Sequence, residues 1–161
     1  MTRWTPKCPK DLIMIIAVAV ALKEICAGVR GYAWPKPDVC PVCGSVSVWG
    51  HGYVRAYFDG CLEGVLLRRY RCAQCHCVMR LRPAAYWSRF QASIADIRTS
   101  ISHRLKTCRY VSCFSRTRQR HWLKALKRKA HAYLGEVLSK DLLCAFERLV
   151  EMGKTPVSRS I

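Results

Sequence analysis

The order of apolar and polar residues divides the chain into a strand-rich part and a helical part. Apolar and aromatic residues dominate residues 46–58 and 65–71, and turn-forming residues occupy 59–64 between them. This pattern predicts a β-hairpin. Beyond Pro83 the apolar residues recur every three or four positions, which predicts helices. The expected fold class is therefore α+β, with a small β-hairpin domain followed by a region of about three helices.

Three helices are expected after Pro83. The first runs from about Tyr86 to Lys106, because apolar residues from Phe90 onward form one stripe. The second begins after Ser115, a suitable N-cap, and carries Trp122 on its buried side. The third is expected to start at Ser139 with Asp141 in its first turn, and to stop at Gly153.

An apolar run without interruption occupies residues 12–22. A membrane span needs about twenty apolar residues, so this run is too short to be one. Its β-branched residues favour a buried strand or helix end that packs on the hairpin domain. A signal peptide is the alternative, because a basic start precedes the run and Ala19-Val20-Ala21 resembles a cleavage site.

Prolines mark the expected boundaries between the parts of the chain. Residues 1–37 are an apolar N-terminal strand or helix, 38–84 form the cysteine-rich hairpin domain, and 85–153 form the helical region. Residues 154–161 follow a glycine and are expected to be a frayed tail.

Two C-x-x-C pairs stand at the two ends of the predicted hairpin: Cys40 with Cys43, and Cys72 with Cys75. Each such pair turns two thiolates towards one centre, and two pairs complete the tetrahedron that zinc prefers. We therefore expect one structural Zn²⁺ in a four-cysteine zinc ribbon. Free or disulfide-bonded cysteines are the alternative reading. Three neighbouring residues could substitute as ligands: Cys61, His76 and Cys77.

Positive charge dominates the composition, since 28 Lys and Arg face 10 Asp and Glu, for a net charge of +18 and a pI near 9.9. Such an excess points to a polyanionic partner. Twelve of the cations lie between residues 86 and 133, where there is only one acid. The candidate nucleic-acid-binding residues are Arg116, Arg118, Arg120, Lys124, Lys127, Arg128 and Lys129 on the second helix, with Arg55, Arg69 and Arg71 on the strands. A merely solvated face is the alternative.

Four short motifs carry a resemblance to a known family: C-P-V-C-G-S at Cys40, H-G-Y-V-R at His51, R-R-Y-R-C at Arg68 and R-Q-R-H-W-L at Arg118. Over residues 37–134 the chain resembles the zinc-ribbon and helix-turn-helix proteins associated with bacterial insertion-sequence transposases. The resemblance implies a DNA-binding module. His51-Gly52 fits a tight strand or bulge rather than a ligand role.

No phosphate loop, nucleophile elbow or His-Glu-x-x-His motif occurs, so we expect a binding protein and not an enzyme. Duplex DNA is the expected partner, favoured over RNA, and a homodimer is compatible with it. An RNA-binding or ribosome-associated ribbon protein, with Trp49, Tyr53 or Tyr57 stacking on bases, stays open, as does a protein-interaction adaptor. The expected location is the cytoplasm, without a membrane span.

Overall fold

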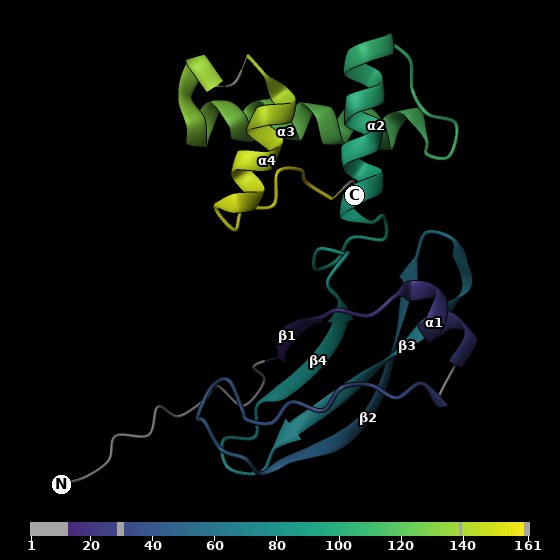
Figure 1. Cartoon of the computed structure of the whole chain (residues 1–161), viewed down its shortest axis with the longest axis vertical. Helices are drawn as coiled ribbons and strands as arrows, with labels where there is room; N and C mark the ends of the chain where they lie inside the picture. Colours follow the sequence, from purple (N-terminus) through teal and green to yellow (C-terminus); the bar gives the residue numbers. More distant parts are fainter. Residues whose placement is uncertain (1–12, 29–30, 139, 160–161) are drawn as a thin grey trace, which may run out of the picture. The chain divides into compact units, whose positions relative to one another are not determined.

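The computed structural model describes residues 13–28, 31–138 and 140–159 (Figure 1). The chain forms two compact units, residues 1–91 and residues 92–161. The first holds a four-stranded sheet and a short helix, and the second holds three helices. The fold is therefore of the α+β class, and each unit is described by itself.

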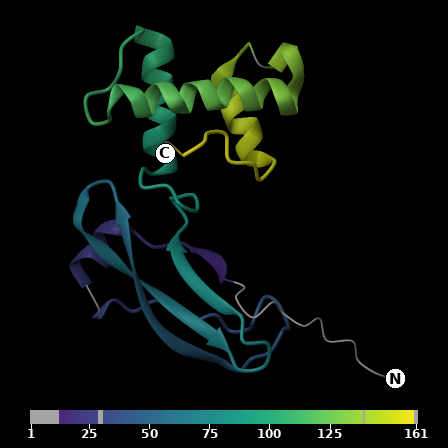
Figure 2. The ribbon, with the colours of Figure 1, turned by 180° about the vertical axis from the view of Figure 1, so that it is seen from behind.

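The sheet of the first unit contains β1 (Ile13–Val18), β2 (Val48–Phe58), β3 (Cys61–Cys72) and β4 (Val78–Pro83), in the order β1-β4-β3-β2. β3 pairs antiparallel with both β2 and β4, whereas β1 pairs parallel with β4 (Figure 2). The helix α1 (Leu22–Gly28) follows β1 and buries Ile25. The predicted hairpin is thus the centre of a larger sheet.

The hairpin turn is shorter than the expected loop over residues 59–64. Phe58 pairs with Cys61, so that only Asp59 and Gly60 lie outside the strands. Residues 62–64 belong to β3 because a β-bulge accommodates them: the register of the two strands shifts between Ala56 and Phe58. On β3, opposite this shift, Gly64 adopts a left-handed φ of +75°. A second shift, at His51 and Gly52, confirms the bulge expected at that pair.

The apolar run near the N-terminus forms the edge strand β1, as far as the structure describes it. Its residues alternate between exposed and half-buried, and Ile13 and Ile15 are 54% and 40% exposed. The expectation of a buried strand is therefore wrong for the face that carries Ile13 and Ile15, whereas Met14, Ile16 and Val18 on the other face pack against the core. No helix among the described residues is both long and apolar enough to cross a membrane.

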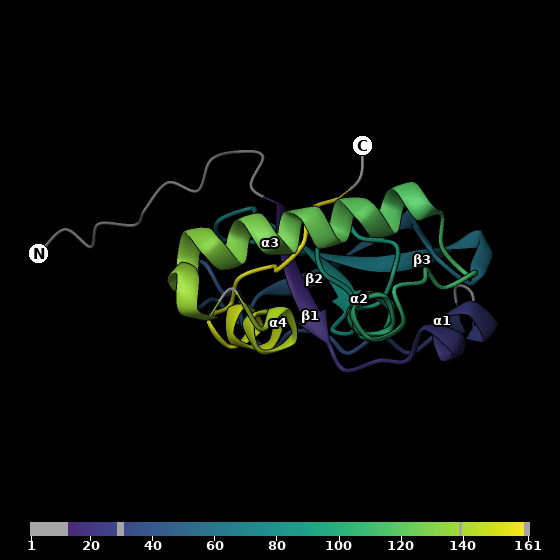
Figure 3. The same ribbon diagram turned by 90° about the horizontal axis from the view of Figure 1, so that it is seen from above.

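The second unit contains α2 (Ile94–Thr107), α3 (Arg116–Leu138) and α4 (Leu142–Glu151). α2 and α4 both lie across α3, on the same side of it (Figure 3). Trp122, Ile97 and Phe146 are buried among the three helices. The face of α3 that carries Trp122 is thus the packed face, as the sequence predicted.

Helix boundaries differ from the expected ones in two places. α2 begins at Ile94 rather than at Tyr86, because the Ser93 hydroxyl caps it by accepting a hydrogen bond from the Asp96 amide at 3.0 Å. α4 begins after Asp141, whose carboxylate accepts from two amides of the first turn. The expected start, Ser139, lies outside the described residues.

A buried glutamine connects the loop before α3 to the rest of the second unit. The Gln119 carbonyl oxygen accepts from the Ser100 hydroxyl at 2.9 Å and from the Val111 amide at 3.1 Å. Its amide nitrogen donates to the carbonyls of Val111 and Phe114 at 2.8 and 2.7 Å. Gln119, only 3% exposed, thereby satisfies all four of its hydrogen-bonding sites and holds the α2–α3 loop.

The segment after α4 is ordered against α3, so the expected frayed tail is wrong for residues 154–159. Val157 is buried, and Lys129 donates from Nζ to the carbonyls of Thr155 and Val157, the latter at 2.9 Å. Lys129 of α3 thus anchors this segment, a long-range contact that the local composition of residues 154–159 does not reveal.

Candidate metal centre

The four predicted cysteines meet at one end of the sheet. All four Sγ atoms lie within 4.8 Å of one another, with Cys40 and Cys75 at 3.6 Å and Cys43 and Cys72 at 3.5 Å. A tetrahedron of thiolates around Zn²⁺, with Zn–S bonds of about 2.3 Å, has edges of about 3.8 Å. The donor set and its spacing therefore fit one metal ion, and these four cysteines can hold it.

The same backbone geometry positions both cysteine pairs. The amide of Gly44 donates to the Cys40 carbonyl at 2.8 Å, and the amide of His76 donates to the Cys72 carbonyl at 3.1 Å. The amide of each first cysteine donates in turn to the carbonyl five residues later. We call these two turns, residues 40–45 and 72–77, the knuckles. The Ala73 amide of the second knuckle donates a hydrogen bond of 2.9 Å to the carbonyl of Ser47, which follows the first knuckle. The sheet thus brings two equivalent turns face to face.

Left-handed backbone is required at one position in each knuckle. Gly44 has a φ of +71° and His76, at the corresponding place, has a φ of +60°. Glycine adopts this region freely, whereas an L-residue with a side chain does so at a cost of about 1–2 kcal/mol. His76 is therefore the strained residue of the second knuckle, and its side chain is exposed.

Electrostatics already favour a thiolate at one ligand. Burial raises the pKa of Cys72, but the backbone amides of Cys75 and Gln74 donate to its sulfur and hold that pKa at about 7. Burial and the neighbouring sulfurs raise the pKa of Cys75. Binding of a cation would lower the pKa of Cys75, because positive charge stabilises every thiolate around it.

The three residues considered as substitute ligands are not part of the cluster. Within the described chain, the group with metal-binding spacing consists of the two C-x-x-C pairs alone. Cys61 lies against Cys26 instead, and Cys77 is buried with its sulfur 3.9 Å from the Val78 carbonyl. Their nearness in sequence therefore does not bring them to the metal centre.

The cations of α3 divide into two groups. Five are exposed: Arg116, Arg120, Lys124, Lys127 and Arg128. At 3.6 residues per turn they fall within about 120° of the helix circumference, opposite the buried residues. None of these five has a carboxylate partner among the residues that the structure describes.

The other two candidates on α3 make intramolecular contacts. The Arg118 guanidinium stacks on the rings of Phe114 and Trp122, at 5.3 and 4.9 Å from their centroids. Lys129 binds the backbone carbonyls near the C-terminus, and its burial lowers its pKa. Both side chains therefore contribute to the packing of the second unit.

The three candidate arginines of the sheet belong to the first unit, and each pairs with a different residue of a neighbouring strand. Arg71 is exposed opposite Trp49, which is 63% exposed. Arg55 pairs with Leu66 farther along the hairpin, and Arg69 pairs with Arg80 of β4. Only Arg71 stands beside an exposed aromatic ring in the strand register.

Comparisons with models of protein families, with curated proteins and with solved structures gave no match to this chain. The assignment of the site therefore rests on the geometry of its own residues.

Proposed function

We propose that the protein is a zinc-ribbon nucleic-acid-binding protein, with duplex DNA as its partner and without catalytic activity. The cation is Zn²⁺, held by Cys40, Cys43, Cys72 and Cys75. The binding surface is the exposed face of α3 with its five cations. The family resemblance over residues 37–134 agrees with this, as a DNA-binding module related to insertion-sequence transposases.

Four thiolates favour a structural role for the metal. A tetrahedral ion with four protein ligands keeps no position for water, whereas catalytic zinc keeps one. Cys40 and Cys72 are buried in the core of the first unit, so the metal site is continuous with that core. Zinc thus supplies part of the folding free energy.

The observation that carries the nucleic-acid proposal is the unpaired face of α3. Its five cations, between residues 116 and 128, cover about 18 Å of helix at 1.5 Å per residue. Elsewhere in the second unit, two acids pair with cations, Glu147 with Arg98 and Glu151 with Arg148. Mutual repulsion on α3 is therefore uncompensated within the described part of the unit and would be relieved by phosphates.

A salt titration tests this proposal. Binding of the zinc-loaded full chain to a fluorescent duplex of random sequence is followed by anisotropy. If five phosphates are neutralised, the plot of log K against log salt has a slope of about −4.5. A flat plot would rule out binding through this face.

A pair of matched variants locates the surface. Lys124→Gln with Lys127→Gln should make the slope less negative by about 1.8, since two phosphate contacts are lost. Lys23→Gln with Lys36→Gln removes the same charge from exposed lysines of the first unit and should leave the slope nearly unchanged. Equal effects of the two pairs would show that net charge, and not α3, governs binding.

RNA is a second candidate, favoured by Trp49. This exposed ring pairs across the strands with the exposed Arg71, an arrangement suited to stacking on an unpaired base. Trp49→Ala should then weaken binding to single-stranded RNA by about 1–3 kcal/mol and leave duplex DNA unaffected. Tighter binding of RNA than of duplex DNA by the unaltered protein would favour this candidate.

A further inference from the structure

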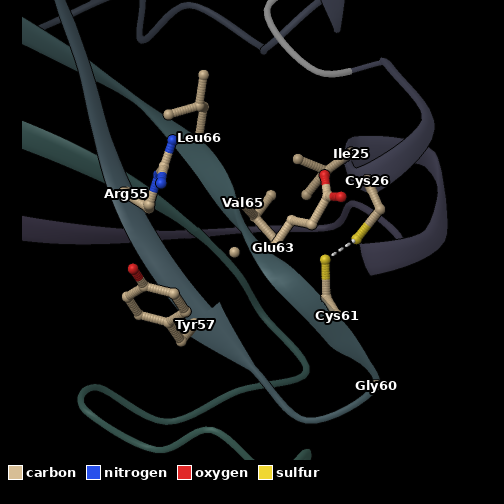
Figure 4. A pocket seen from close by; sticks show the side chains of 10 residues that line it. Ile25, Cys26, Arg55, Tyr57, Gly60, Cys61, Glu63, Val65 and Leu66 are labelled. Atoms are coloured by element: carbon tan, nitrogen blue, oxygen red, sulfur yellow. Dashed lines mark hydrogen bonds between the residues drawn. The ribbon is translucent and has the colours of Figure 1, made fainter.

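A second pair of cysteines lies apart from the metal centre, between α1 and the start of β3. Cys26 is on the last turn of α1, and Cys61 is the first residue of β3. Their Sγ atoms are 2.8 Å apart, with Cys26 as donor and Cys61 as acceptor. Figure 4 shows the two thiols directed toward one another. Residues 35 positions apart in the chain thus meet sulfur to sulfur.

This distance distinguishes the pair from the metal ligands. The ligand sulfurs are 3.5 and 3.6 Å apart, close to the edge of a zinc–thiolate tetrahedron. At 2.8 Å the sulfurs of Cys26 and Cys61 are too close to flank a metal ion in the same way. In the part of the chain that the structure describes, no further His, Cys, Asp or Glu joins them in a metal-binding group.

Small molecules in solution can reach the pair. Both thiols line an open hollow of about 810 Å³ between α1 and the β2–β3 hairpin, together with Arg55, Tyr57 and Glu63 (Figure 4). Both cysteines are half-buried rather than sealed in the core. A small oxidant can thus approach the sulfurs without unfolding the first unit.

We propose that Cys26 and Cys61 are a modification site, at which a peroxide forms a disulfide while the metal centre stays intact. Cys61 attacks the peroxide, whose O–O bond breaks, and becomes a sulfenic acid as one water leaves. The sulfur of Cys26 then attacks that of Cys61, the S–O bond breaks, and a second water leaves. Two thiols lose two electrons and two protons, and one H₂O₂ becomes two waters.

The environment of Cys26 agrees with this order of steps. Burial raises its pKa to about 11, and the hydrogen bond and charge of Cys61 add to the effect. Cys26 therefore keeps its proton at neutral pH and reacts second, as the resolving thiol. Zn²⁺ bound by Cys40, Cys43, Cys72 and Cys75 would share the lone pairs of their sulfurs and so slow the reaction of these four thiolates with peroxide.

The disulfide would close a loop that contains the first knuckle. Residues 26–61 include Cys40 and Cys43, so that the cross-link joins α1 to the hairpin around two of the four ligands. Cross-linking restricts the unfolded chain and so favours the folded state. The oxidised protein should consequently melt at a higher temperature and exchange zinc more slowly than the reduced protein.

Peptide mapping tests the proposal directly. The zinc-loaded full chain is treated with one equivalent of H₂O₂, free thiols are alkylated, and the protein is digested with trypsin without reduction. Cleavage after Lys and Arg places Cys26 in residues 24–30 and Cys61 in residues 56–68, each peptide with a single cysteine. We expect these two peptides linked, with a mass two hydrogens below their sum, and one zinc retained per chain.

Two variants make the result decisive. Cys61→Ser should abolish the linked peptide and the rise in melting temperature, whereas Cys144→Ser, which removes an exposed single thiol of α4, should leave both unchanged. Recovery of Cys26 and Cys61 alkylated, while other cysteines oxidise or zinc is lost, would overturn the proposal. DNA binding is not part of this readout, so recovery of both cysteines alkylated, with zinc retained, would overturn this proposal and leave the proposed function untouched.

Discussion

Replacement of Gln119 by methionine should destabilise the helical unit more than any exposed substitution. The side chain keeps its length but loses both polar atoms, so four partners lose their hydrogen bonds: the Ser100 hydroxyl, the Val111 amide and the carbonyls of Val111 and Phe114. Each intramolecular hydrogen bond contributes about 1 kcal/mol net, and an orphaned buried group costs about 1–3 kcal/mol. Val111 and Phe114 are only half-buried, so water can replace part of the loss.

The expected decrease in the free energy of unfolding is therefore about 3–4 kcal/mol. Urea unfolding of the zinc-loaded protein, followed by circular dichroism at the helical band, measures it. Gln91→Met changes an exposed glutamine of the first unit and should cost less than about 0.5 kcal/mol. A decrease below about 1 kcal/mol for Gln119→Met would refute the reasoning, because the four bonds would then contribute almost nothing.

Gln119→Glu separates the two halves of the network. One carboxylate oxygen can still accept hydrogen bonds from Ser100 and Val111. The other oxygen replaces the amide nitrogen and faces the carbonyl oxygens of Val111 and Phe114, to which it cannot donate a hydrogen bond while it is ionised. Burial and these carbonyls should raise its pKa in the folded state above the unfolded value of about 4.3. The variant should therefore be most stable at acid pH and lose stability as the pH rises through its folded pKa.

Three further predictions concern the cysteine sites. His76→Gly should stabilise the metal-loaded protein in thermal melting by up to about 1 kcal/mol, while Gly44→Ala should destabilise it by a similar amount, since both positions need left-handed backbone. Cys43→Ser should lower zinc stoichiometry in elemental analysis and unfold the first unit, and full retention of zinc would contradict the metal assignment. In reduced protein, Cys26 should contribute stability that is present below pH 9 and is lost as the pH rises through about 11, because its folded pKa exceeds the unfolded value. Oxidation of Cys26 to the disulfide should abolish this contribution, as a comparison of urea midpoints across pH can show.

Local patterns predict the parts of the molecule that depend on neighbours in sequence. Two thiols three residues apart converge within one turn of backbone, so the spacing of the C-x-x-C pairs is enough to identify the four cysteines that gather at the candidate metal centre. The buried faces of α3 and α4 follow in the same way from the spacing of Trp122, Phe146 and their neighbours. The short hairpin turn does not follow from the pattern, because the extra residues of β3 are absorbed in a bulge.

Long-range pairings are beyond local patterns. β1 pairs parallel with β4, and the paired residues Ile13 and Val78 are 65 positions apart in the chain. The composition of the run favours a strand or a helix end over a signal peptide, but it does not identify β4 as the partner. Cys26 and Cys61 have no characteristic spacing, and their contact depends on where α1 packs. Gln119 looks like one more polar residue of a basic helix, although the loop preceding it makes it a buried one.

The cations of α3 show why counting charges in the sequence overestimates the number of side chains available to a polyanionic partner. Composition treats the seven cations of residues 116–129 alike, yet a cation can also stabilise an aromatic ring or cap carbonyl groups. Arg118 does the first and Lys129 the second, and both functions need residues that lie elsewhere in the chain. What remains is a set of five on one face, so that loss of Lys129 should reduce stability rather than the salt dependence of binding. The variant Lys129→Met tests this. If its plot of log K against log salt were less steep while its free energy of unfolding stayed unchanged, Lys129 would belong to the proposed binding surface.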